Sequence, residues 1–430
     1  MAGLDLAHNC SIIATLATPT KVAPVTGRGL KLRWYICGLL FFATTINYID
    51  RQVLGLLKPV ISRELHWTEA DFGWIISAFQ MAYAIMMPLA GRLVDWIGPK
   101  RGYAIAVIFW SLAAMSHSLA RSVFQFATAR FALGLGESAN FPAALRTVAD
   151  WFPQNERALA TGIFNSGTNI GALVAPLAIP WITVRFGWRP AFLFTSVLVL
   201  IWLILWFTTY RHPPAAVVRA DSAPAARLPY MSLLTERRTW AYLLGKVLTD
   251  PVWWFYLYWL PGFLDKNYGL NLSAMGAPLV AVYLLADVGS VAGGWLSSSL
   301  LKRGLTPNRA RKIAMFVCAI AVTGVMFVPF TKGNLWLAVA LIGLAAGAHQ
   351  GWSANLFTLP SDLFPQEAVG SVVGLGGLGG AISGALAAPL VGYWLDFSHD
   401  AYGPIFMVAG SMYLIALGVI HLMVPKLERL

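Results

Sequence analysis

The chain has 430 residues, of which 58% are hydrophobic and only 12% are charged. Soluble globular proteins carry about 25% charged residues, so this composition excludes an ordinary soluble domain and is typical of an integral membrane protein. The formal net charge of +12 would also suit a nucleic-acid-binding protein, but the positions of the charges favour another explanation.

Apolar stretches long enough to cross a bilayer core of about 30 Å recur along the whole chain. Long runs of this kind indicate helices and not barrel strands. The pattern predicts an all-α integral membrane protein with twelve transmembrane helices, at residues 33–57, 71–93, 101–118, 122–147, 157–184, 188–210, 239–264, 274–301, 310–330, 334–361, 369–395 and 402–425.

Lysine and arginine residues gather on one side of these predicted helices. If the N-terminus is cytoplasmic, the cytoplasmic loops and tails hold most of them, which is the positive-inside rule. The sequence therefore predicts that both termini are cytoplasmic. The net positive charge is then a consequence of membrane topology, and nucleic-acid binding is not expected.

The predicted helices divide into two groups of six. Residues 1–29 lack a charged segment followed by a cleavage site, and we interpret them as a flexible cytoplasmic tail. The Pro-, Ala- and Arg-rich stretch 211–238 is typical of a cytoplasmic linker. Two six-helix bundles are therefore predicted, at 30–210 and 239–430.

Two short segments of the first half recur in the second half, in each case about half the chain later. DWFPQ (150–154) returns as DLFPQ (362–366), and GALVAPL (171–177) returns as GALAAPL (384–390). Two parallel six-helix repeats, with a substrate site between them near the membrane midplane, are the architecture of major facilitator transporters.

The predicted loop between the second and third helices carries a glycine- and charge-containing motif. It reads GRLVDWIGPKR, and its motif positions are Gly91, Asp95, Gly98, Lys100 and Arg101. A solvated turn would explain the basic residues but not the spacing of the glycines and the aspartate. The pattern resembles the signature of the major facilitator superfamily, and the resemblance implies the role of a gate latch.

Ionisable residues within the predicted helices are costly in a membrane and are often functional. They are Asp50, Arg51, Arg130, Glu137, Lys246, Asp250 and Asp287. Asp50 and Arg51 are adjacent and point about 100° apart on a helix, so each needs another partner. We expect Asp50 to pair with Arg130, leaving Arg51 free to bind a substrate carboxylate in the central cavity.

Asp50 and Glu137 are the predicted proton carriers, and Arg130 is expected to tune them. Two acids in a partly dry cavity can load and release protons as their access to water changes. The alternative is a static salt-bridge network that only holds the first and fourth helices together.

Lys246 and Asp250 are one helical turn apart and can pair with each other. The alternative is a surface pair that snorkels toward water. The aromatic run that follows includes Trp254 and offers a flat wall for a sugar ring, although such runs also form interfacial belts. The roles of Asp250 and Asp287 stay open.

Uncharged polar residues on the fifth and tenth predicted helices are further candidates, because polyhydroxylated ligands satisfy many donors and acceptors. They are Asn165, Asn169, His349, Gln350, Ser353 and Asn355. Hydrogen bonding between helices is the alternative. The glycine-rich segment 374–384 is interpreted as close helix packing and not as a phosphate loop.

Several segments together are similar to the anion:cation symporter family of this superfamily, and within it to the bacterial hexuronate transporters. They are NYIDR (47–51), RFALGLGESANFPAA (130–144), FNSGTNIGA (164–172), GWRPAF (187–192), DPVWWFYLYWLP (250–261) and AHQGWSANLFTLPSDLFP (348–365). The resemblance implies that Asp50 and Glu137 carry protons, that Tyr48 and Arg51 meet the substrate, and that Tyr83 lines its pocket. Lys246, Gln350, Trp352 and Asn355 are the implied sugar contacts.

The predicted function is therefore proton-coupled symport of hexuronates such as glucuronate and galacturonate by alternating access. The protein is expected to act as a monomer in the bacterial inner membrane. The alternatives are symport of an aldonate such as galactonate or of another organic anion, and a non-transporting membrane sensor. No nucleophile elbow, phosphate loop or metal-ligand pair appears in the sequence, so no enzyme activity, cofactor or metal is expected.

Overall fold

The computed structural model describes residues 27–152, 154–211, 230–331 and 333–427. Every regular element in these ranges is a helix, as the sequence predicts. The first bundle contains α2 (Gly27–Leu65), α3 (Glu69–Ile97), α4 (Pro99–Ser116), η1 (His117–Leu119), α5 (Val123–Glu137), α6 (Asn140–Trp151), α7 (Gln154–Phe186) and α8 (Trp188–Thr209).

The second bundle begins after the linker, most of which lies outside the described residues, as does nearly all of the predicted tail 1–29. It contains α10 (Tyr230–Leu234), α11 (Arg237–Tyr268), α12 (Gly276–Lys302), α13 (Pro307–Thr323), η3 (Gly324–Phe330), α14 (Leu335–Leu356), α15 (Leu359–Leu363), α16 (Gln366–Phe397) and α17 (Gly403–Met423).

Each of the twelve predicted transmembrane helices coincides with one of these helices or with two consecutive ones. Among the described residues, nine helices are long and apolar enough to cross a membrane by length and composition alone. The other predicted spans are α2, α5 with α6, and α11. Buried charges lower the mean hydropathy of α2 and α11, and the break after Glu137 leaves α5 only 15 residues long.

Local sequence signals set several helix ends. Thr68 and Asp71 form a capping box at the start of α3, in which each side chain accepts a hydrogen bond from the other residue's backbone N–H. Gly98 ends α3 with φ of +86°, a conformation that favours glycine. Pro99 then occupies the first turn of α4, where its missing N–H costs nothing.

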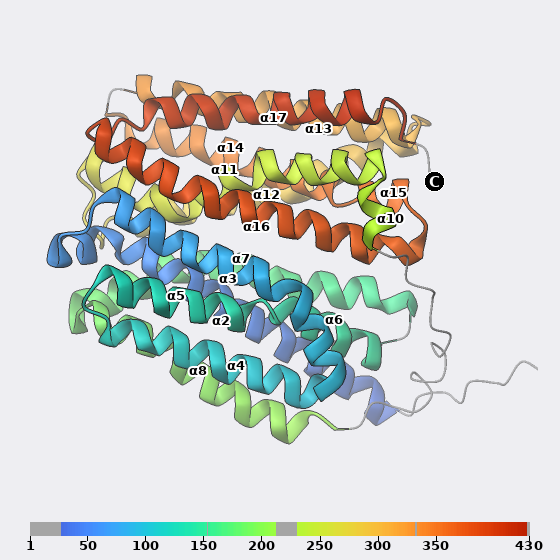
Figure 1. Cartoon of the computed structure of the whole chain (residues 1–430), viewed down its shortest axis with the longest axis horizontal. Coiled ribbons are helices and arrows are strands. Elements are labelled where there is room, and N and C mark those ends of the chain that lie inside the picture. Colours follow the sequence, from blue (N-terminus) through green and yellow to red (C-terminus); the bar gives the residue numbers. More distant parts are fainter. Residues whose placement is uncertain (1–26, 153, 212–229, 332, 428–430) are drawn as a thin grey trace, which may run out of the picture.

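The two bundles lie side by side with their helices along the long axis of the molecule (Figure 1). They meet mainly where α3 packs on α16, and also where α2 packs on α11 and α7 on α12. Close approach of α3 and α16 depends on glycine, because a Cβ atom at Gly73 would lie 2.6 Å from the carbonyl oxygen of Ala388. The small residues on these helix surfaces therefore allow the two bundles to pack closely.

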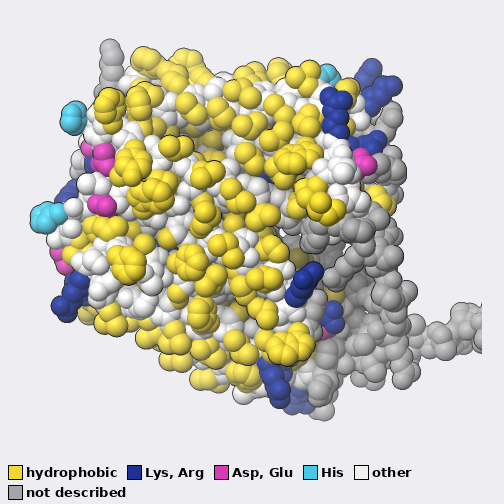
Figure 2. Space-filling view, in the orientation of Figure 1, with side chains coloured by type: hydrophobic (Ala, Val, Ile, Leu, Met, Phe, Trp, Pro, Cys, Tyr) yellow, Lys and Arg dark blue, Asp and Glu magenta, His cyan; other side chains and the backbone are white. Residues whose placement is uncertain are grey.

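On the face shown in Figure 2, apolar side chains cover the middle of the molecule and charged side chains gather toward its two ends. This surface is the one that a bilayer requires, because charges are costly in its core. Together with the apolar helices it makes the chain a multi-pass membrane protein.

Candidate functional site

A cavity of about 280 Å³ lies between the two bundles, near the lower limit of about 300 to 1,000 Å³ for small-molecule sites. The first bundle lines it with Tyr48, Phe141, Asn165, Thr168, Asn169 and Ala172. The second lines it with Lys246, Asp250, Trp253, Trp254, Leu257, Tyr283, Ala286, Asp287, Ser290, His349, Gln350, Ser353 and Phe357. Contributions from both repeats place the cavity where the sequence predicts a substrate site.

Six of the predicted substrate residues line this cavity. They are Tyr48, Asn165, Asn169, Lys246, Trp254 and Gln350. Sequence reasoning left Asp250 and Asp287 without a role and did not single out Phe141 or Trp253 as ligands, although both acids had been recognised as buried charges.

The predicted placement of Trp352 and Asn355 in the substrate site is wrong for this structure. Trp352 is fully buried and packs edge-on against Tyr413, and the Asn355 side chain donates to the Gly351 carbonyl at 2.9 Å. The physical reason is helical periodicity: Gln350 faces the cavity, so residues two and five positions later point elsewhere.

Lys246 is the only lysine or arginine that lines the cavity in the described part of the chain. Its Nζ lies 2.8 Å from Oδ2 of Asp250, which confirms the predicted pairing within α11. The same Nζ lies 4.4 Å from the ring centroid of Phe357. An anionic ligand entering this cavity would meet one cation that already has a carboxylate partner.

His349 forms part of the cavity wall beside this ion pair. Its ring stacks on Trp253 with centroids 5.1 Å apart, and its Nδ1 lies 2.5 Å from the hydroxyl of Tyr413. The imidazole is therefore held from two sides and is unavailable to turn freely toward a ligand. It joins Trp253 in a rigid aromatic wall.

A second buried ion pair lies in the first bundle, and it is not the one that we expected. Nε of Arg51 lies 2.6 Å from Oε2 of Glu137, with both side chains almost completely buried. Arg130 donates from Nη2 to the backbone carbonyl of Arg51 at 3.3 Å. The predicted pairing of Asp50 with Arg130, and the predicted free Arg51 in the cavity, are therefore wrong for this structure.

Arg51 does not line the cavity, and three aromatic rings contact its guanidinium group. Its guanidinium carbon lies 5.1 Å from the ring centroid of Tyr48, 5.3 Å from that of Phe79 and 4.9 Å from that of Tyr83. Cation–π contacts of this kind suit a desolvated arginine. Tyr83 therefore holds Arg51 and does not line the cavity itself, whereas Tyr48 touches both.

Asp50 stays without an ion-pair partner among the described residues, although it is only 4% exposed. It lies within hydrogen-bonding reach of Thr195, and its Oδ2 has no hydrogen-bond partner. An ionised carboxylate buried in this way is costly. The site is therefore chemically suited to a carboxyl group that gains and loses a proton.

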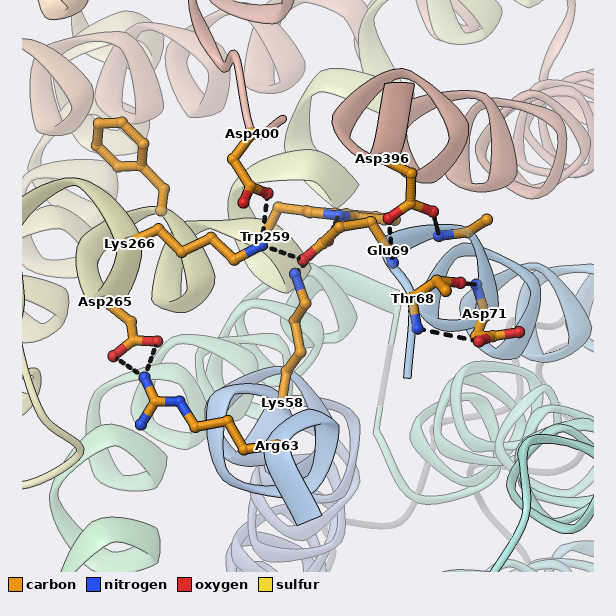
Figure 3. Close-up of polar contacts among 12 residues, drawn as sticks. Lys58, Arg63, Thr68, Glu69, Asp71, Trp259, Asp265, Lys266, Asp396 and Asp400 are labelled. Carbon is orange, nitrogen blue, oxygen red and sulfur yellow. Dashed lines mark hydrogen bonds and ion pairs between the residues drawn. The ribbon is translucent and has the colours of Figure 1, made fainter. Parts of the chain in front are cut away.

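Polar contacts join the two bundles at one end of the molecule (Figure 3), which lies opposite the described C-terminus in Figure 1. Glu69 in α3 forms an ion pair with Lys58 and accepts from Lys266 Nζ at 2.9 Å and from Trp259 Nε1 at 3.2 Å. Lys266 also pairs with Asp400. Lys58 and Glu69 belong to the first bundle and the other three residues to the second.

Two further contacts reinforce this closed end (Figure 3). Asp396 of α16 accepts hydrogen bonds from the backbone N–H groups of Glu69 and Ala70, at 2.8 and 2.7 Å, so it caps α3 from the other bundle. Arg63 pairs with Asp265, with Nη2 to Oδ1 at 2.6 Å. Sequence reasoning missed these residues because they lie in three separate parts of the chain, at residues 58–70, 259–266 and 396–400.

Lys266 stays charged at this end. Burial by itself lowers the pKa of Lys266, but the carboxylates of Glu69 and Asp400 outweigh that effect, so its pKa is raised above the ordinary value. Its favourable interactions are therefore present at physiological pH and would be lost only as the pH rises through that raised pKa.

The glycine- and charge-containing motif stays within the first bundle. A Cβ atom at Gly91 would lie 4.0 Å from Pro142, and the Lys100 carbonyl accepts from Trp206 Nε1 at 2.9 Å. The side chain of Asp95 lies outside the described part of the structure. Gly98 lies between α3 and α4, and Arg101 lies in the first turn of α4. The latch role of the motif stays a prediction.

A model of the Major Facilitator Superfamily matches residues 40–388, which is most of the chain. The chain belongs to the major facilitator superfamily. Its place in this superfamily makes it a membrane transporter and not an enzyme.

Relatives with named functions support this assignment. The chain is 32% identical over 395 residues to the hexuronate transporter of Escherichia coli, covering 88% of this chain and 90% of that protein. It is 33% identical over 280 residues to the galacturonate transporter of Dickeya chrysanthemi, covering 62% of this chain and 81% of the relative. A probable L-galactonate transporter of Escherichia coli is 29% identical, covering 84% and 83%.

Solved structures support the same fold. A bacterial homologue of the human lysosomal transporter Spinster, in an inward-facing and occupied conformation, superposes with a TM-score of 0.74 at 19% identity, covering 91% of this chain and 96% of that one. A D-xylose–proton symporter gives a TM-score of 0.70 at 16% identity, covering 92% and 99%. The major facilitator fold predicted from the internal repeats is confirmed.

Proposed function

We propose that this protein is a proton-coupled symporter that imports hexuronates by alternating access across the bacterial inner membrane, with both termini cytoplasmic. The observation that carries the proposal is the cavity between the bundles, which has one cation, Lys246, among amides, hydroxyls and indole rings. One chain supplies every part of this cavity, so a monomer suffices.

A hexuronate is a compact sugar ring with one carboxylate, and the cavity supplies a partner for each part. Lys246 can bind the carboxylate, Asn165, Asn169 and Gln350 can exchange hydrogen bonds with hydroxyl groups, and Trp254 offers a ring face. The names of the hexuronate and galacturonate relatives favour the same substrate class.

Glu137 and Asp50 are the proposed proton carriers, with Arg130 next to both. Protonation of Glu137 removes the charge that holds Arg51 at 2.6 Å. Arg51 would then be free to reach past Tyr48, which touches both the guanidinium and the cavity, toward the substrate carboxylate. Proton loading and anion binding would be coupled through this one arginine.

Alternating access requires an end that closes and reopens. The contacts of Glu69, Lys266 and Asp396 close one end, and the closed end lies opposite the described C-terminus (Figure 1). With cytoplasmic termini, the structure would correspond to a transporter closed toward the outside. Opening it toward the outside would require these contacts to break.

Uptake by purified protein in liposomes tests the proposal. Labelled glucuronate, galacturonate and galactonate are compared with and without an inward proton gradient and a protonophore. Accumulation of a hexuronate that the protonophore abolishes is the expected result. If only galactonate is taken up, the proposed symport mechanism is retained and the proposed substrate becomes an aldonate. If none of these anions is taken up, the sensor alternative is favoured.

A further inference from the structure

Asp250 occupies an unusual position in the wall that the second bundle gives to the cavity. It is the carboxylate that holds Lys246, the one cation lining the cavity in the described residues, with 2.8 Å between Oδ2 and Nζ. Both side chains are largely buried, with 8% of Lys246 and 17% of Asp250 exposed. A substrate carboxylate that reaches Lys246 must therefore compete with a carboxylate of the protein.

We propose that Asp250 is a built-in competitor for the substrate carboxylate, which displaces it from Lys246 on binding and so makes affinity depend on the anionic group of the ligand. This inference rests on the proposed function and extends it by assigning a role to Asp250. Asp250 acts as a specificity-determining residue, because a neutral sugar cannot replace it at Lys246.

The packing of α16 restricts where the displaced carboxylate can go. Oδ2 of Asp250 lies against Gly380, and a Cβ atom at that position would collide with it. Neighbouring glycines of the segment 374–384 pack on the same helix, with Gly376 against Tyr242 and Gly384 against Trp254, which confirms the predicted close packing. Because α16 fills the outer side, a displaced Asp250 must turn toward the cavity.

The free energy favours replacing the carboxylate partner of Lys246 by that of the substrate over adding a second carboxylate to the same lysine. Breaking a buried ion pair by removing one partner is strongly unfavourable, because the other charge is left uncompensated. Exchanging one carboxylate for another leaves Lys246 paired throughout, while the released Asp250 carboxyl group turns toward the cavity and must be hydrated or protonated there. The empty cavity then has a neutral Lys246–Asp250 pair, and only an anionic ligand can take over the lysine without leaving its charge unpaired.

Asp287 provides a matched control in the same cavity. It is also an acid on the cavity wall, but no ion pair or hydrogen bond is found for it within the described ranges. Asp287→Asn therefore removes the same negative charge from the cavity without releasing a cation. Comparison with Asp250→Asn separates competition for Lys246 from a general change in cavity charge.

Calorimetric titration of the purified protein with D-glucuronate and with D-glucose, at fixed pH and ionic strength, tests the inference. Asp250→Asn is expected to tighten glucuronate binding about tenfold, since the empty state then holds an unpaired buried lysine. Asp287→Asn should change the Kd much less, and neither variant should improve glucose binding. Thermal unfolding of each variant, and the Asp250→Glu variant, control for misfolding.

The double variant Lys246→Gln, Asp250→Asn completes the cycle. The gain from Asp250→Asn should disappear when Lys246 is already glutamine, and selectivity for glucuronate over glucose should fall. Equal effects of Asp250→Asn and Asp287→Asn, or weaker glucuronate binding in a folded Asp250→Asn protein, would overturn the inference while leaving the proposed function intact. Failure of the wild-type protein to bind any hexuronate would instead overturn the proposed function and this inference with it.

Discussion

Replacing Glu69 with glutamine is expected to shift the protein toward opening at its closed end. The Glu69 side chain is only 8% exposed and accepts from Lys266 and Trp259 of the other bundle, at 2.9 and 3.2 Å. Glutamine keeps the shape of the side chain but loses its charge. Contacts across the bundles are lost on opening, so weakening them favours the open form.

The magnitude follows from the two contacts that cross the bundles. The Lys266 side chain is 34% exposed, so solvent screening limits that ion pair to about 1 kcal/mol. Replacing a charged acceptor by a neutral one weakens the Trp259 hydrogen bond by about a further 1 kcal/mol. The ion pair of Lys58 with Glu69 lies within the first bundle, so its loss changes the free energies of the closed and open forms by about the same amount. A total of about 2 kcal/mol changes the ratio of closed to open forms roughly thirtyfold.

Distances between spin labels at the closed end measure this shift. His66→Cys in the first bundle and Asn271→Cys in the second are both exposed positions. Cys37 and Cys318 are buried, so replacing Cys10 by serine leaves the two introduced thiols as the labelling sites. Double electron–electron resonance spectroscopy should show a larger population with a long distance between the two labels in Glu69→Gln than in the parent protein.

Glu64→Gln is the matched control. Glu64 also accepts from an indole and a cation, Trp188 at 2.7 Å and Arg189 at 3.1 Å, but both partners lie in its own bundle. The distance distribution should therefore not change. An unchanged distribution in Glu69→Gln, or the same lengthening in Glu64→Gln, would refute the assignment of Glu69 as a gate residue.

Three other predictions concern the site and the packing. Glu137→Gln should spare counterflow of a hexuronate but stop accumulation driven by a proton gradient, and equal loss of both would contradict its proton-carrying role. Gly289→Ala should lower the free energy of unfolding by about 1–3 kcal/mol, because a Cβ atom would collide with Gly347. Gly294→Ala on the same helix is the control: its Cβ atom would meet open space, so the substitution should be neutral or slightly stabilising when thermal unfolding is measured. Asn355→Leu should lower the free energy of unfolding by about 1–3 kcal/mol, because it removes the buried hydrogen bonds that the amide donates to the Gly293 and Gly351 carbonyls at 3.1 and 2.9 Å. The Kd for glucuronate should be unchanged in the protein that folds.

Properties that depend on neighbours along the chain could be predicted from the sequence. Hydropathy gave the helices and their membrane setting, because a span of about 20 apolar residues is a local property. The pairing of Lys246 with Asp250 was equally local, since residues four apart lie on one face of a helix. The repeated segments indicated the two-bundle architecture, because a repeat can be recognised by comparing one half of the sequence with the other.

Properties that depend on the rotation and depth of one helix against another were decided only by the tertiary structure. The sequence showed that Asp50 and Arg51 each need a partner. The relative placement of α2 and α5 pairs Arg51 with Glu137 and leaves Asp50 without an ion pair among the residues that the structure describes. At the closed end Lys266 meets Glu69, which is 197 residues away in the chain, and Asp400, which is 134 residues away, so no spacing could reveal these pairs. Sequence sets which charges are buried, whereas the rigid packing of helices sets which of them meet.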